Sequence, residues 1–170
     1  MAATNPTPTS QPKQQKITTF LWFDGNAEEA ANFYCSVFKN SRILNIARYG
    51  EAGPGPKGTV MVVDFELDGQ NLTALNGGPQ FKFNEAISLV IHCDTQDEID
   101  YYWEKLTSDG GQESMCGWLK DKYGLSWQVV PSILPELFRN DETGNKVLQA
   151  VMQMRKLDLA TMQKAAEGRS

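Results

Sequence analysis

The sequence predicts an α+β protein made of two consecutive modules, each with the order strand, helix and then three strands (β-α-β-β-β). Three observations predict this class. Runs of β-branched and aromatic residues alternate with stretches of helical periodicity, helix-capping patterns open both expected helices, and the two halves of the chain align with each other. A chain of 170 residues has room for one such pair of fused half-domains.

The two ends of the chain differ in composition from its middle. The N-terminal end is rich in Pro, Thr, Ser, Gln and Asn without apolar periodicity, so we expect it to be disordered. Helical patterns recur after Pro131, over Lys146–Lys156 and again after Asp158. The expected regions are a disordered tail at 1–15, a first module at 16–80, a second module at 81–131 and a C-terminal helical extension at 132–170.

The first module begins with a strand in the β-branched and aromatic run 17–23. Asn26, with Glu29 three residues later, forms a capping box that predicts a helix over about 27–39. An Asp-Gly turn separates the last two strands of the module. The three strands after the helix are expected at 42–49, 63–67 and 70–75.

The second module repeats this order. A strand is expected at 86–93, and Thr95 with Glu98 forms a second capping box before a helix that ends at two glycines. The remaining strands are expected in the extended stretch 112–119 and at 125–130.

An internal repeat relates the two modules. A shift of 69 residues places Asn26 on Thr95 and Thr19 on Ser88. Towards the end of each module the turn glycines match with a shift of 55, which places Thr73 opposite Gln128. Because a single such unit leaves one sheet face exposed, we expect it to need a partner that covers this face.

Composition excludes several classes of function. The formal net charge is −5 and no Lys/Arg cluster offsets it, so nucleic acid is not an expected partner. No apolar run approaches the length of a membrane span, and the N-terminus lacks the apolar region of a signal peptide. The three cysteines Cys35, Cys93 and Cys116 form no C-x-x-C pattern, which is typical of a reducing compartment and predicts a cytoplasmic location.

Three motifs resemble the PhnB-like proteins, a group once labelled demethylubiquinone methyltransferase-like. They are FLWFDGNAEEA at 20–30, LNGGPxFKF at 75–83 and CGWLKDxxGxxWQVVP at 116–131, and the resemblance extends over about 16–164. The resemblance implies the vicinal oxygen chelate fold, in which two β-α-β-β-β modules form a cupped mixed sheet around a cavity. It also implies a homodimer, in some members with exchanged modules.

The resemblance further implies where a metal would bind, because each module of the metal-dependent relatives supplies one ligand from its first strand and one from its last. The repeat places these positions at Thr19, Thr73, Ser88 and Gln128. Hydroxyl and amide groups are poor ligands for a divalent cation, and they supply no negative charge. We therefore predict no tightly bound metal and no other cofactor. His92, the only histidine, shares the face of Ser88 and is either structural or at the rim of the cavity.

The old methyltransferase label has no support in the sequence. An adenosylmethionine-dependent methyltransferase usually has a doubly wound sheet and a glycine-rich turn between strand and helix. The corresponding turn here, Asp24-Gly25-Asn26, has one glycine. Cys116 could act as a reactive thiol if a cation lowered its pKa, or it could be incidental, since Lys120 is near in sequence but no histidine is.

An aromatic-lined cavity with a few amide groups is typical of a small-molecule site. The candidates for such a cavity are Trp22, Asn76, Cys116, Trp118 and Gln128. The alternative is that both tryptophans belong to the core and that Asn76 only makes a turn.

Three functions remain open. The first is a cytoplasmic homodimer that binds an unidentified small, partly apolar molecule. The second is a metal-dependent lyase, isomerase or dioxygenase with an atypical site. The third is a non-catalytic dimeric interaction protein whose C-terminal stripe of Val147, Leu148, Val151 and Met154 is exposed to a partner.

Overall fold

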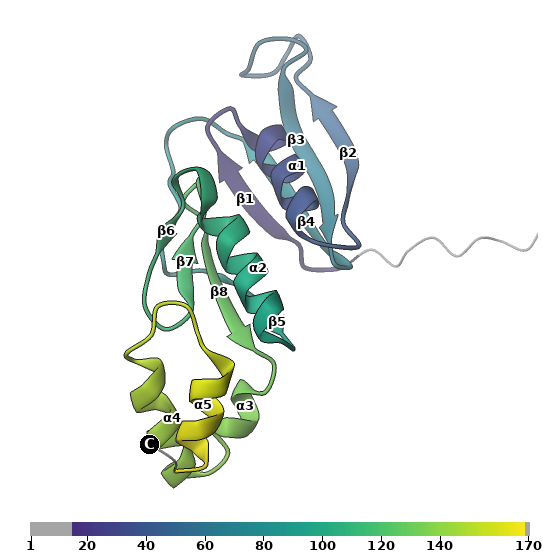
Figure 1. Ribbon diagram of the computed structural model, residues 1–170. Helices are drawn as coiled ribbons and strands as arrows, with labels where there is room; N and C mark the ends of the chain where they lie inside the picture. The colour runs from purple at the N-terminus through teal and green to yellow at the C-terminus, as the bar shows by residue number, and fades with distance from the viewer. Residues whose placement is uncertain (1–14, 169–170) are drawn as a thin grey trace, which may run out of the picture.

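A computed structural model describes residues 15–168 (Figure 1). These residues form two four-stranded mixed sheets with helices, which confirms the α+β class and the two-module architecture. The expected tail falls almost entirely on residues 1–14, which lie outside the described part of the chain. Within residues 15–168, no helix combines the length and apolarity needed to cross a membrane.

The first sheet has the strand order β1-β4-β3-β2, in which β1 runs parallel to β4 and the other neighbours are antiparallel. Helix α1 begins at Ala27, as predicted, and ends two residues before the expected boundary. The elements of this module are β1 (Thr19–Phe23), α1 (Ala27–Val37), β2 (Arg42–Arg48), β3 (Val60–Leu67) and β4 (Gln70–Asn76).

The second sheet has the equivalent order, β5-β8-β7-β6, with β5 parallel to β8. The repeat found in the sequence is therefore a repeat of topology. The stretch expected to be extended at 112–119 is two short strands joined by a turn. The elements are β5 (Leu89–Cys93), α2 (Gln96–Thr107), the 3-10 turn η1 (Ser108–Gly110), β6 (Gln112–Glu113), β7 (Trp118–Lys120) and β8 (Ser126–Pro131).

Each long helix covers one face of its own sheet. Alternate side chains of β3, such as Val63 and Phe65, are fully buried on the face towards α1, where Ala30, Ala31 and Tyr34 are also fully buried. The two helix-covered sides share one continuous hydrophobic core. In this core the ring of Tyr34 contacts Trp127 of β8, with 5.6 Å between the ring centroids.

The capping pattern is correct for one helix and wrong for the other. Thr95 Oγ1 accepts a hydrogen bond from Glu98 N at 3.2 Å, as a capping box requires. Asn26 makes no side-chain cap, and the Oδ1 atom of Asn76, at the end of β4, accepts the Ala27 N–H at 2.9 Å instead. A residue 49 positions away thus caps α1, which no local pattern can predict.

The C-terminal extension packs against the second module. Its helices are α3 (Leu134–Leu137), α4 (Asp141–Val151) and α5 (Leu159–Ala166), grouped at the end of the molecule in Figure 1. They enclose a second hydrophobic cluster of Val130, Val147, Val151, Leu157 and Met162. The expectation of an exposed C-terminal stripe is therefore wrong for Val147 and Val151, although Leu148 is exposed.

Candidate functional site

The first sheet has one face that no helix among the described residues covers. The corresponding face of the second sheet, which carries Gln128 and Val130, meets the C-terminal helices at its Val130 end, where Val130 packs against Val147. We call these two faces the open faces. In β1, Leu21 and Phe23 are buried towards α1, so Phe20 and Trp22 lie on the open face of the first sheet. Phe20 is 60% exposed. In β5, Val90 lies on the open face of the second sheet and is 45% exposed. The open faces thus expose apolar side chains.

On the second open face, the structure brings together Ser88 and Gln128. The Gln128 Nε2 atom donates a hydrogen bond to Ser88 Oγ over 2.9 Å, and both side chains are half-buried. Gln128 lies opposite Val90 in the register of β8 and β5. His92, two residues further along β5, is exposed on the same face.

On the first sheet, the structure separates Thr19 from Thr73. Thr73 lies opposite Phe20 in the parallel register, whereas Thr19 lies opposite Leu72 on the side of the core. Successive residues of a strand point to opposite faces of the sheet, so an error of one residue in the alignment places a side chain on the wrong face. Phe20, and not Thr19, therefore lies beside Thr73 on the open face. Thr73 Oγ1 donates a 2.7 Å hydrogen bond to Oδ1 of Asp64, a carboxylate that sequence reasoning missed.

These groups do not fit a tightly held divalent cation. The donors at the expected positions are hydroxyls and one amide, and Asp64 is the carboxylate bonded to them. Between residues 15 and 168, no group of three or more His, Cys, Asp or Glu side chains is arranged to hold a metal ion. One carboxylate does not balance a buried dication, so we derive no metal-dependent step.

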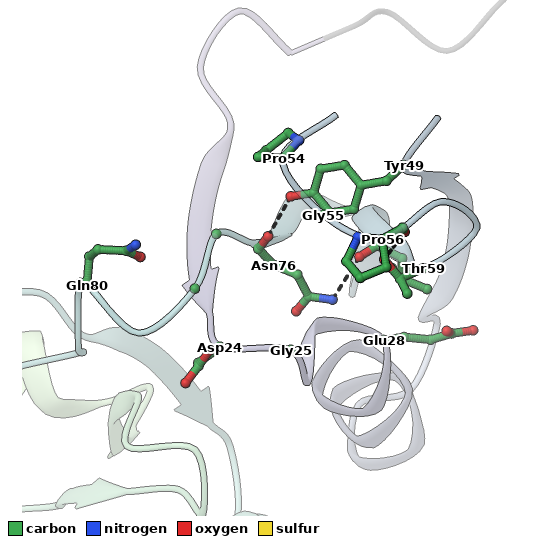
Figure 2. A pocket seen from close by; sticks show the side chains of 13 residues that line it. Asp24, Gly25, Glu28, Tyr49, Pro54, Gly55, Pro56, Thr59, Asn76 and Gln80 are labelled. Atoms are coloured by element: carbon green, nitrogen blue, oxygen red, sulfur yellow. Dashed lines mark hydrogen bonds between the residues drawn. The ribbon is translucent and has the colours of Figure 1, made fainter. Parts of the chain in front are cut away.

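A first cavity of about 690 Å³ lies at the end of β4, under the loop of residues 50–56 (Figure 2). Asn76 stands at its centre, but its amide is already occupied: Oδ1 caps α1, and Nδ2 donates to Val60 O at 3.1 Å. The Tyr49 hydroxyl donates to Asn76 O at 2.9 Å. Asn76 therefore ties a helix, two strands and a loop together beside this cavity.

Trp22 fixes the loop beside the first cavity and is not among the residues that line it. Its Nε1 atom donates to Gly78 O at 2.8 Å, and its ring meets Phe81 edge to face at 4.9 Å between centroids. The ring lies directly against Gly77, where a Cβ atom would come within 2.3 Å of it. Only glycine fits at that position.

A second cavity, of about 470 Å³, lies along β6 and β7, and Cys116 and Trp118 line it. Lys120, also in its wall, forms an ion pair with Glu85. The wall further contains Ser126 of β8, which sequence reasoning missed. Ser126 is 0% exposed, and its Oγ atom has no hydrogen-bond partner within residues 15–168.

Cys116 stands at a constrained turn between β6 and β7. Its φ of 60° is left-handed, and its N–H donates to Met154 O at 2.8 Å. Its Sγ atom lies 3.7 Å from Sδ of Met152. Among the described residues no cationic side chain donates a hydrogen bond to the thiol.

The five candidates from the sequence therefore fall in three places. Trp22 and Asn76 belong to the surroundings of the first cavity, Cys116 and Trp118 line the second, and Gln128 pairs with Ser88 on the open sheet face. Ser126 could not be singled out, because a serine at the start of a strand gives no sign in the sequence that its hydroxyl lacks a partner.

A comparison with family models matches residues 15–130 to the family described as 3-demethylubiquinone-9 3-methyltransferase. Among solved structures, a putative 3-demethylubiquinone-9 3-methyltransferase, PhnB protein, from Bacillus cereus is 46% identical. That match covers 69% of this chain and 99% of that chain, with a TM-score of 0.63. A search of curated proteins found no match.

Two more distant structures share the fold. A Pseudomonas aeruginosa protein is 20% identical with a TM-score of 0.57, covering 69% of this chain and 98% of its own. A fosfomycin resistance protein from Listeria monocytogenes is 14% identical with a TM-score of 0.50, covering 74% and 98%. The family resemblance drawn from the three motifs is confirmed: the chain belongs to the 3-demethylubiquinone-9 3-methyltransferase family, the PhnB-like group.

Proposed function

We propose that this protein is a cytoplasmic homodimer that binds a small, partly apolar molecule between open sheet faces of two copies, without a tightly bound metal. The observation that carries the proposal is the exposure of Phe20 and Val90 on the open faces of the two sheets. Apolar sheet faces of this kind mark sites for a partner or a ligand.

The two modules of one chain meet through their helix-covered sides, which leaves both open faces directed away from the shared core. A second copy can place its own sheet opposite an open face. Such an assembly would enclose a cup with apolar walls and polar groups at its floor, the usual character of a small-molecule site. The Ser88–Gln128 pair and the Thr73–Asp64 pair supply those polar groups.

The polar pairs also support binding without a metal. Gln128 donates to Ser88, and Thr73 donates to Asp64, so these groups satisfy one another in the absence of a cation. The family description includes methyl transfer, but the described residues form two mixed sheets, neither of them doubly wound. We therefore propose ligand binding and not adenosylmethionine chemistry.

A thermal-shift screen of metal-free protein tests the proposal. Protein dialysed against a chelator is mixed with a library of neutral aromatic and carbonyl compounds, and in parallel with zinc, nickel and manganese salts. We expect at least one organic compound to raise the unfolding temperature, and we expect metal salts to leave it unchanged. If only a metal salt stabilises the protein, the metal-dependent alternative replaces this proposal.

A further inference from the structure

Ser126, in the wall of the second cavity, has a side-chain oxygen that forms no hydrogen bond with the described residues. Ser126 lies opposite Lys120 in the antiparallel register of β8 and β7, on the open side of the second sheet. Its hydroxyl is fully buried and has no hydrogen-bond partner in the part of the chain that the structure describes. Buried polar groups are nearly always paired. Because Ser126 is 0% exposed, its hydroxyl becomes available to a molecule in the cavity when a neighbouring wall side chain moves, and that molecule would then supply the missing partner.

The charged groups around this cavity are already paired. Lys120 forms an ion pair with Glu85. Glu113 accepts the Trp103 indole N–H at 2.9 Å and lies 3.7 Å from an Arg155 nitrogen. A charged ligand would find no free counter-charge among these side chains, and its desolvation would oppose binding. The cavity therefore favours a neutral molecule.

The other residues that line the cavity indicate which kind of molecule would fit it. Met115, Cys116, Trp118 and Leu119 also line the cavity and supply mainly apolar atoms, and an indole such as that of Trp118 packs well against another aromatic ring. Methionine sulfur also makes favourable contacts with aromatic rings. A volume of about 470 Å³ is within the range of small-molecule sites and exceeds the needs of a single ring.

We propose that the second cavity binds a neutral aromatic molecule with one uncharged oxygen, an aryl ketone or a phenol, whose oxygen pairs with the Ser126 hydroxyl. The inference rests on the proposed function, because Trp118 in the wall of this cavity lies opposite Gln128 of the Ser88–Gln128 pair. It names the chemical class of the ligand and the residue that forms a hydrogen bond with it. A hydroxyl both donates and accepts, so Ser126 can serve a carbonyl or a phenol oxygen.

Three probes separate the features of this ligand. Acetophenone carries the ring and the oxygen, ethylbenzene lacks the oxygen, and benzoate carries a charge. In calorimetric titrations of the full-length protein, acetophenone should bind more tightly than either of the others. Equal binding of ethylbenzene would overturn the role of the Ser126 hydroxyl, and tighter binding of benzoate would overturn the preference for a neutral molecule.

Ser126→Ala should produce two effects that would not occur together if the serine had only a structural role. The variant should bind acetophenone about tenfold more weakly, the size of one neutral hydrogen bond. The ligand-free variant should unfold at the same or a higher temperature, because an unpaired buried hydroxyl is removed. Ser36→Ala is the matched control, since it removes an exposed helix hydroxyl that donates to Phe33 O, and it should change neither value.

The outcomes distinguish this inference from the function on which it rests. If acetophenone binds and Ser126→Ala binds it equally well, the inference fails and ligand binding stands. The same holds if the screen finds ligands but no aryl ketone or phenol is among them. If no organic compound in the screen binds, the proposed function fails and the inference fails with it.

Discussion

The hydroxyl of Tyr34 on α1 donates a 2.8 Å hydrogen bond to Oδ2 of Asp121, which joins the first module to the β7–β8 turn of the second. Asp121 is almost fully buried and also accepts the Trp127 indole N–H at 2.8 Å. The backbone N–H groups of Tyr123 and Leu125 donate to its other oxygen, at 2.9 and 3.1 Å. All four partners donate, which suits an ionised carboxylate that only accepts.

The surroundings shift the pKa values of both acidic groups at this junction. Burial raises the pKa of the Asp121 carboxyl, while the hydrogen bonds from Trp127 and Tyr34 lower it in part. Burial, together with the neighbouring Asp121 charge, raises the pKa of Tyr34 well above its usual value. The tyrosine therefore stays a hydrogen-bond donor at physiological pH, and the link between the modules persists.

We predict that Tyr34→Phe destabilises the protein by about 1.5–3 kcal/mol, the usual cost of removing a hydrogen bond to a buried charged group. Urea unfolding followed by circular dichroism measures the change. Tyr101→Phe is the control, because the Tyr101 hydroxyl donates to the neutral Val37 O at 2.9 Å. It should cost about 1 kcal/mol or less. Equal costs for the two variants would contradict the assigned role of Asp121.

A second prediction concerns two glycines with similar backbone conformations. Gly117 has a φ of 82°, and a Cβ atom there would lie 2.8 Å from Val129 O. Gly124 has a φ of 86°, with no atom within 4 Å of the added Cβ. Alanine should cost about 1–2 kcal/mol at Gly124 for the left-handed conformation alone. Gly117→Ala should cost more, because β8 must also shift, and chemical denaturation compares the two.

The cap of α5 should make the stability depend on pH. Hydrogen bonds from Thr161 hold the pKa of the Asp158 carboxyl below its usual value, so ionised Asp158 stabilises the fold. That contribution is complete above the unfolded pKa of about 4 and is lost as the pH falls through the lower folded value. Asp158→Ala should therefore cost about 1 kcal/mol at pH 7.

The same variant should cost progressively less below about pH 4, because protonation removes the same contribution from the wild-type protein. Denaturation curves of the two proteins at pH 7, 4 and 3 measure this convergence. A difference that stays constant over this range would show that the carboxylate charge of Asp158 is not what stabilises α5.

Local patterns in the sequence predicted the fold well because strand and helix periodicities recur twice. They could not predict contacts that arise only when distant segments meet. The cap of α1 comes from Asn76 and not from Asn26, and Asp121 is buried against a tyrosine from the other module. Neither relationship has a signal within a short window of sequence.

The site was harder to predict than the fold. The two modules were aligned on their helix caps, and this alignment is one residue off in the first strand. It therefore assigned to Thr19 the open-face position that Phe20 occupies. Ser88 and Gln128 are nevertheless in contact, at 2.9 Å. The spread of the five candidate residues over two cavities and one sheet face depends on loop geometry, as does the unpaired hydroxyl of Ser126.

The last prediction tests whether a second copy completes the open faces, the central claim of this account. Light scattering coupled to size-exclusion chromatography gives the molar mass in solution at micromolar concentration. We predict the mass of two chains for the wild-type protein and of one chain for Phe20→Asp, which places a charge on the first open face. A wild-type protein that elutes with the mass of a single chain would contradict the account.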